Sequence, residues 1–317
     1  MQVARRSRPL PASPRQMRVR PGAVWCINRA FRDRADGSGL RLCGAERQRI
    51  LMRAAGMLPA SSLDSEPMAD TLEFGTLDIT DFTVGAMLRA GIAIRRAVRG
   101  AESLESAAEV IVRYLYDHCV DVKTGERSCA MTRFYKTHPF GGLEPAQQRF
   151  ATAQLGGMPP SEEMRCLTLL ATAGDEPAWN SRHESRGHAA IPLPTAESVR
   201  AVPMVTRLIE ELGLDLESVV AGSAPPTRGP DARTYDVFHV EDALASPFIP
   251  AQREFVIPHR IASVVGFGGL LRSGELFAVI IFSRARIPAR SAARFRTIAL
   301  DVRSSLFSFD ETNTWTR

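Results

Sequence analysis

Lysine, long apolar runs and closely paired cysteines are nearly absent from this 317-residue sequence. Only two of its 40 basic residues are lysines, Lys123 and Lys136, so no glycine-rich stretch is followed by the lysine that a phosphate-binding P-loop requires. The longest apolar run, Leu276–Phe282, has the length of a strand and falls far short of the roughly 20 residues that span a bilayer. Five cysteines without a CxxC spacing are typical of reduced thiols in a cytoplasmic protein, and they exclude a disulfide framework.

Signatures of catalysis are missing as well. The sequence has no HExxH pair, no GxSxG turn, no Ser–His–Asp order and no paired-carboxylate motif. Cys119 falls on the apolar side of a predicted helix, while Cys129 and Cys166 fall in predicted strands among apolar neighbours. We therefore expect buried, unreactive thiols and a protein without catalysis of its own.

The net charge of +5 is unevenly distributed. Residues 1–67 hold thirteen arginines against five acidic residues, a charge of +8, which leaves −3 for the remaining 250 residues. This Arg-rich leader shows no sustained period of 2 or 3.6, so we expect it to be disordered, or to be spurious sequence ahead of a natural start at Met68. A basic arm and a targeting peptide are the alternatives. Because the rest of the chain is mildly acidic, nucleic acid is not an expected partner.

Three glycines occur in the stretch VVGFGG at 264–269. A P-loop or a dinucleotide fingerprint would place such glycines between a strand and a helix. Here 260–268 alternates like a strand, 271–274 has the residues of a hairpin loop, and 275–283 is apolar on both faces, as expected of a central strand. The glycines are therefore predicted to be structural, with Gly268 and Gly269 as places where a ligand could approach the backbone.

Three amphipathic helices frame the predicted fold. The first begins at Thr80 or Asp81 and ends at Gly100, the second covers 102–120, and a closing helix is capped by Ser291. Their apolar stripes comprise Val84, Met87, Leu88, Gly91, Ile94 and Val98; Leu104, Ala107, Ala108, Ile111, Val112, Leu115 and Cys119; and Phe295, Ile298, Ala299, Val302 and Leu306. The first and third stripes predict either a core face or a dimer contact.

Further strands are expected over 129–137, 164–174 and 233–240, with short helices between them. The pattern predicts an α+β fold, an antiparallel sheet flanked by N- and C-terminal helices. The segments RTYDVFHVED, SPFIPAQREFVIPHRIASVVGFGG, GELFAVIIFSR and SAARFRTIALDVRSSLF occur in the order of a GAF domain, and the chain resembles that family in them. RFYKTHPFG, MRCLTLLATAGDEPAWN and RGHAAIPLP are similar to GAF-like sensory segments of bacterial signalling proteins.

This resemblance divides the chain into the leader 1–67, a GAF-like sensory domain with helical insertions over 78–309, and a tail over 310–317. It implies a cytoplasmic sensory or regulatory protein that binds a small molecule and signals through helix packing, as a homodimer or with a signalling partner. It does not specify the ligand, because GAF pockets accept cyclic nucleotides, tetrapyrroles, haem and metabolites. Two alternatives stay open: a GAF-fold enzyme that uses a reactive cysteine, and an interaction module without a ligand.

Polar and aromatic side chains near the predicted sheet are the candidates for a ligand site. The candidates are Arg133, Tyr135, Trp179, Arg182, His188, His239, Phe267 and Gly268. Such groups could supply the few polar contacts that a mostly apolar pocket needs. His183 and His188 lack the close ligand pairs of zinc sites, so no metal is expected.

Overall fold

The computed structural model describes residues 75–185, 187–223, 236–309 and 314–316, so the predicted leader and Met68 lie outside the described residues. Within them, one antiparallel sheet has the strand order β3-β2-β1-β6-β5-β4. The strands are β1 Cys129–Pro139, β2 Arg165–Gly174, β3 Ala190–Leu193, β4 Val237–Val240, β5 Ser263–Leu270 and β6 Leu276–Ser283. As predicted, β6 is central and joined to β5 by a hairpin.

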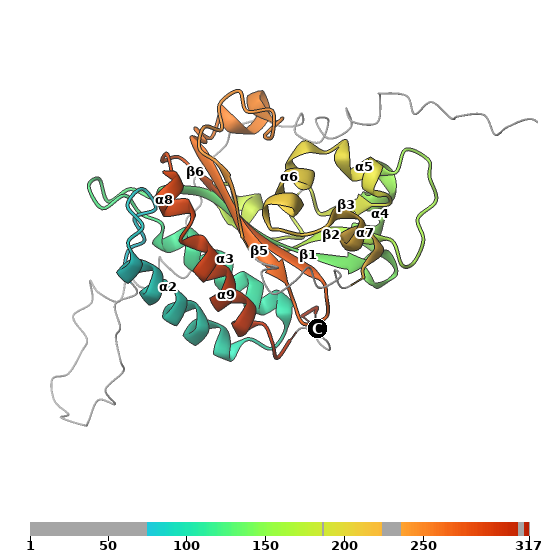
Figure 1. Cartoon of the computed structure of the whole chain (residues 1–317), viewed down its shortest axis with the longest axis horizontal. Helices are drawn as coiled ribbons and strands as arrows, with labels where there is room; N and C mark the ends of the chain where they lie inside the picture. The colour runs from blue at the N-terminus through green and yellow to red at the C-terminus, as the bar shows by residue number, and fades with distance from the viewer. Residues whose placement is uncertain (1–74, 186, 224–235, 310–313, 317) are drawn as a thin grey trace, which may run out of the picture.

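Helices cover both faces of this sheet. The helices are α2 Val84–Ala97, α3 Leu104–His118, α4 Pro145–Gln154, α5 Ala196–Arg200, α6 Pro203–Glu211, α7 Leu216–Ala221, α8 Ala289–Ala292 and α9 Phe295–Ser305. Short turns are η2 Val98–Gly100, η3 Phe140–Gly142, η4 Pro177–Asn180 and the π-helical η5 Gln252–Val256. Figure 1 shows α2, α3 and α9 on one side of the sheet and α5, α6 and α7 on the other. None of the described helices is both long and apolar enough to cross a membrane.

The predicted fold class, an α+β antiparallel sheet between N- and C-terminal helices, is confirmed by this arrangement. Several local features differ from the prediction. The closing helix is split into α8 and α9 around residues 293–294, and Ser291 lies inside α8 and does not cap it. Helix α2 is capped by Thr83, not by Thr80 or Asp81. Strand β3 and helix α7 were not expected. These differences are short-range and leave the layers unchanged.

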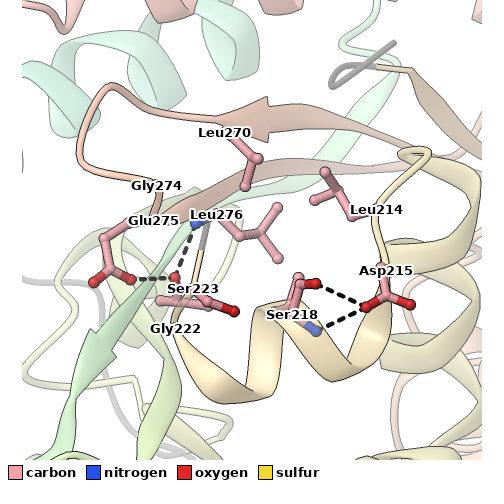
Figure 2. A pocket seen from close by; sticks show the side chains of 11 residues that line it. Leu214, Asp215, Ser218, Gly222, Ser223, Leu270, Gly274, Glu275 and Leu276 are labelled. Carbon is pink, nitrogen blue, oxygen red and sulfur yellow. Dashed lines mark hydrogen bonds between the residues drawn. The ribbon is translucent and has the colours of Figure 1, made fainter. Parts of the chain in front are cut away.

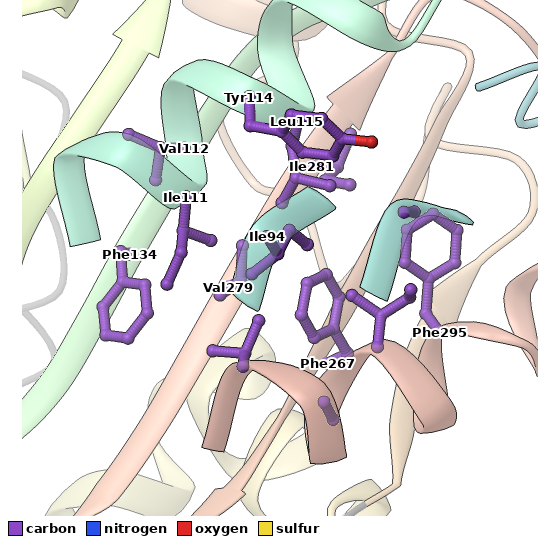
Figure 3. Packing of buried hydrophobic residues seen from close by; sticks show 14 of the residues in the cluster. Ile94, Ile111, Val112, Tyr114, Leu115, Phe134, Phe267, Val279, Ile281 and Phe295 are labelled. Atoms are coloured by element: carbon purple, nitrogen blue, oxygen red, sulfur yellow. The ribbon is translucent and has the colours of Figure 1, made fainter. Parts of the chain in front are cut away.

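The core between the sheet and α2, α3 and α9 defines the α3 face of the sheet. The predicted stripes of α3 and α9 are buried throughout, because each aligns one side of its helix with apolar strand residues. Phe134, Phe267, Val279 and Ile281 point into this core from the strands, and Figure 3 shows them meeting Ile111 and Phe295. The Phe267 ring stacks on the Phe295 ring at a centroid distance of 5.4 Å.

The predicted stripe of α2 is right for Gly91, Ile94 and Val98 but wrong for Val84 and Leu88, which are exposed. The side chains that α2 buries besides these are alanines. A small-residue face lets α2 approach α9 closely, and a Cβ on Gly91 would overlap the Asp301 carboxylate. Close helix packing therefore rotates the larger apolar residues of α2 towards the solvent.

The opposite face of the sheet, the α6 face, carries a second core. Tyr135, Leu169, Val264 and Ile280 point into it from the strands, because successive strand residues alternate between faces. Helices α5, α6 and α7 and the η4 and η5 turns cover it. This face contains the polar cluster described next.

Candidate functional site

Arg133 is a buried arginine in the middle of β1, on the α6 face. Its terminal nitrogens donate to three neutral oxygens: the Ser185 hydroxyl at 2.8 Å, the Gly187 carbonyl at 3.1 Å and the Tyr135 hydroxyl at 3.2 Å. Only 5% of Arg133 is exposed. Strand alternation places Arg133 and Tyr135 on one face, and the chain that returns to β3 brings Ser185 and Gly187 to them.

Two polar atoms at this position have no hydrogen-bond partner among the described residues. The Arg133 Nε is buried without an acceptor, and so is the hydroxyl of Thr172, the residue directly opposite Arg133 in β2. Thr172 is as buried as Arg133. A buried polar group without a partner costs about 1–3 kcal/mol and calls for a specific explanation. A ligand that supplies the missing contacts is one such explanation.

Other arginines show what a structural arginine looks like in this protein. Arg165 and Arg284 also have an unpaired Nε, but Arg165 pairs with Glu275 and Arg284 with Asp175. Arg182 pairs with two carboxylates. In contrast, no acidic residue of the described chain forms an ion pair with Arg133 in the structure. Arg133 therefore combines deep burial with an uncompensated charge.

His188 lies beside this cluster in a backbone conformation that non-glycine residues rarely adopt. Its φ angle is 60°, in the left-handed region. Burial, followed by the charge of Arg133, lowers the pKa of His188 to about 4, so the ring is neutral near pH 7. Strained backbone that persists beside buried polar groups is a feature of functional sites.

The predicted candidates therefore separate into groups. Arg133, Tyr135 and His188 lie together. Arg182 lies elsewhere, in an ion cluster with Glu105 of α3 and Glu144 before α4, and its guanidinium is 4.9 Å from the Trp315 ring centroid. The same cluster also holds residues 314–316 of the tail, because the Thr316 amide donates a hydrogen bond to Glu105 at 2.9 Å.

The remaining candidates belong to three further environments. Trp179 packs against His259 and Phe255 on the α6 face, at ring distances of 4.6 and 5.7 Å. His239 places Nε2 at 2.8 Å from the Ile287 carbonyl. Phe267 lies in the core of the α3 face.

Gly268 lies in β5 beside the backbone of β6. A Cβ at this position would be 2.1 Å from the Phe277 carbonyl oxygen. The space beside this glycine is thus filled by the neighbouring strand, one of the situations that favours glycine within a strand.

Three residues of the cluster were not predicted: Ser185 and Gly187, which accept bonds from Arg133, and Thr172, which lies opposite it in β2. A partial signal for Thr172 was present, because it is one of two threonines, with Thr168, in the apolar stretch LTLLATAG. No comparable signal marks Ser185 or Gly187, which occur in a uniformly polar stretch.

Thiol and metal chemistry find little support in the described chain. Cys119, Cys129 and Cys166 are free and buried. Burial raises the pKa of Cys129 and Cys166 to about 12, and that of Cys119 well above its ordinary value, so their reactive thiolate forms are disfavoured. Among the described residues, no group of three or more His, Cys, Asp or Glu side chains is placed to hold a metal ion.

A small cleft opens at another end of the α6 face, between α7 and the β5–β6 hairpin. Figure 2 shows Leu270, Leu276 and Leu214 on its apolar side and Glu275 on its polar side. Its volume is ≈ 10 Å³, about the room that one water molecule needs. The carboxylate of Glu275 already pairs with Arg165 and accepts a bond from Thr137 at 2.5 Å. This cleft therefore has little room and no uncompensated charge at Glu275. The Arg133 cluster differs in holding two buried polar atoms without a partner in the described chain.

No family model and no curated protein matches the sequence. Solved structures similar to the chain include GAF domains of phosphoenolpyruvate-protein phosphotransferases from Acinetobacter and Coxiella burnetii. Their sequence identities are 12% and 11% and their TM-scores 0.34 and 0.38; each match covers 69% of this chain and 92% of the other. The phycoerythrobilin-bound GAF domain of a cyanobacterial phytochrome matches at 10% identity and a TM-score of 0.36, covering 70% of this chain and 94% of that domain. All three are GAF domains, the family that the sequence resembles, but likeness at this level supports neither a ligand nor an activity.

Proposed function

We propose that this chain is a GAF-like sensory or regulatory domain that binds a small molecule at Arg133 on the α6 face. The observation that carries the proposal is a pair of facing strand residues, Arg133 and Thr172, whose buried Nε and hydroxyl have no partner in the part of the chain that the structure describes. A site that is incomplete by itself gains stability when a ligand completes it. The sequence resemblance to sensory GAF domains agrees with this role.

In this role the domain itself is not catalytic, and ligand occupancy is transmitted through helix packing to a partner, either a second copy of the chain or another signalling protein. The alternative of cysteine-based catalysis is less favoured, because burial keeps the three described thiols protonated.

Thermal unfolding of the full chain against cyclic nucleotides, haem, bilins and small organic metabolites tests the proposal. A ligand at 100 times its Kd should stabilise the native state by about 2.7 kcal/mol. Arg133→Gln should remove the shift, whereas Arg200→Gln, in an exposed ion pair with Glu217, should leave it unchanged. If no compound shifts the unfolding of the wild type, an interaction module without a ligand becomes the better hypothesis.

A further inference from the structure

The uncompensated charge of Arg133 indicates the chemical class of the ligand. We propose, on the basis of the proposed function, that the ligand is a small organic molecule with one carboxylate on an apolar body, and that its carboxylate pairs with the Arg133 guanidinium. Burying a charge is costly unless a counter-charge accompanies it. The described chain gives Arg133 neutral oxygens alone, so an anionic ligand would be the group that completes it.

The balance of charge favours a single negative charge. Among the described residues in contact with Arg133, none carries a second positive charge, and the neighbouring His188 is neutral near pH 7. Lys136 is in the same strand but is an odd number of residues away, so it lies on the opposite face of the sheet. Against the charges of the described residues, a monocarboxylate would balance Arg133, whereas a doubly charged phosphate would leave one negative charge over.

The geometry of the cluster shows how a carboxylate would enter. A guanidinium presents parallel N–H groups that match the two oxygens of a carboxylate. In the structure, Ser185 and Gly187 occupy two of these donors with a hydroxyl and a carbonyl. Both are neutral acceptors, and the Nε beside them has no acceptor among the described residues. A carboxylate that reaches Nε would supply this contact, and its charge would make its bonds stronger than those of the neutral acceptors.

The surroundings specify the rest of the molecule. The cross-strand neighbours of Arg133 are Thr172 and Ile280, and Met131 and Tyr135 flank it along β1 on the same face. Beyond the polar groups already named at Arg133, the neighbouring side chains Met131 and Ile280 are apolar and buried. The ligand should therefore be apolar beyond its carboxylate, with one acceptor or donor within reach of the Thr172 hydroxyl.

The test compares carboxylates with amides of the same shape. Binding of benzoate and benzamide, and of acetate and acetamide, is measured on the full chain by calorimetry and thermal unfolding at constant ionic strength and pH 7. We expect the carboxylate to bind about tenfold more tightly or better, because a hydrogen bond between charged groups is roughly twice as strong as one between neutral groups. Arg133→Gln should abolish this preference for the carboxylate. Arg133→Lys, which keeps the positive charge without the parallel N–H groups of a guanidinium, should retain part of it.

Thr172→Val is the matched variant for the second unpaired atom. Valine has the shape of threonine without the hydroxyl, and that hydroxyl has no partner to lose. We expect the melting temperature of the free protein to stay level or to rise by about 2–4 °C, the change that 1 kcal/mol gives at this size. A fall of several degrees would show that the Thr172 hydroxyl is bonded within the protein.

The outcomes separate the ligand class from the proposed function. Equal affinity for benzoate and benzamide, or a preference for benzoate that persists in Arg133→Gln, overturns the carboxylate proposal and leaves the sensory role in place. The carboxylate proposal also fails, and the sensory role stays, if a neutral compound from the wider panel binds and Arg133→Gln abolishes its binding. If neither the probes nor any panel compound binds, the carboxylate proposal and the proposed function both fail.

Discussion

Arg182 offers the sharpest test of how much burial adds to the strength of an ion pair. Its ion cluster is buried, and the same chain has an exposed ion pair, Arg200–Glu217, for comparison. The side chains of Arg182 and Glu105 are 4% and 5% exposed, and Glu144 accepts two further bonds from Arg182 at 2.8 Å. Removing one partner of a buried ion pair typically costs about 3–5 kcal/mol, because the other charge stays buried. We expect Arg182→Gln to lower the free energy of unfolding by about 3 kcal/mol, mostly through Glu105, since Glu144 is one-third exposed and screened.

The assay is urea unfolding of the full chain at pH 7, followed by circular dichroism. Arg200→Gln is the matched control, because the Arg200–Glu217 pair has a comparable distance of 2.8 Å but side chains that are 54% and 62% exposed. Its cost should not exceed about 0.5 kcal/mol. The reasoning is refuted if the two substitutions cost the same, because burial would then make no difference to an ion pair in this protein.

The pH dependence gives an independent check on the same cluster. The hydrogen bonds from Arg182 hold the pKa of Glu144 below its ordinary value of 4.5. A lowered native pKa contributes stability above 4.5 that is lost as the pH falls through the native value. The difference in stability between wild type and Arg182→Gln should therefore narrow below pH 4.5, and a constant difference would argue against the pairing with Glu144.

Three further predictions concern other parts of the molecule. The native pKa of His188 is lowered from 6.5 to about 4, so protonation of its ring favours the unfolded chain. The free energy of unfolding should therefore fall as the pH is lowered from 6.5 to 4. In urea titrations, His188→Gln should reduce that fall by about 1–3 kcal/mol. Gly268→Ala should cost about 1–3 kcal/mol or more by crowding Phe277, whereas Gly100→Ala, with no atom within 4 Å, should stay within about 0.5 kcal/mol. With the two leader cysteines replaced by serine, a thiol reagent should label none of the remaining cysteines in the folded chain and all of them in urea; rapid labelling of the folded chain would revive the reactive-cysteine hypothesis. Those cysteines are Cys119, Cys129 and Cys166.

The sequence predicts an element and its buried face correctly where one local pattern of apolar residues determines both. The stripe of α9 predicts its buried face correctly, because Phe295, Ile298 and Val302 are large apolar residues on one side of a helix with polar neighbours. The apolar run of β6 likewise predicts a strand covered on both faces. In each case the pattern and the packing point to the same structure.

The prediction of the buried face of α2 was partly wrong, because the size of its side chains, more than their polarity, determines how this helix packs. On α2, apolar character alone selects Val84 and Leu88 as core residues, but the helix packs through its alanines and Gly91. The reason is in α9, whose Asp301 occupies the space beside Gly91 and pairs with Arg95. That contact joins residues more than 200 positions apart, so no window along α2 contains it.

The candidate site shows the same limit in its chemistry. Arg133 and Arg182 are both arginines near aromatic residues in the sequence, and nothing local shows which of them the fold pairs with a carboxylate. The structure separates them by their partners: Arg182 reaches carboxylates 77 and 38 residues away, whereas the hydrogen bonds of Arg133 to described residues go to neutral oxygens. A buried charge that the fold neutralises contributes to stability, and one that the fold leaves uncompensated has affinity available for another group. For this reason the proposal of a ligand site rests on Arg133, which no acidic residue of the described chain pairs, and not on a sequence motif.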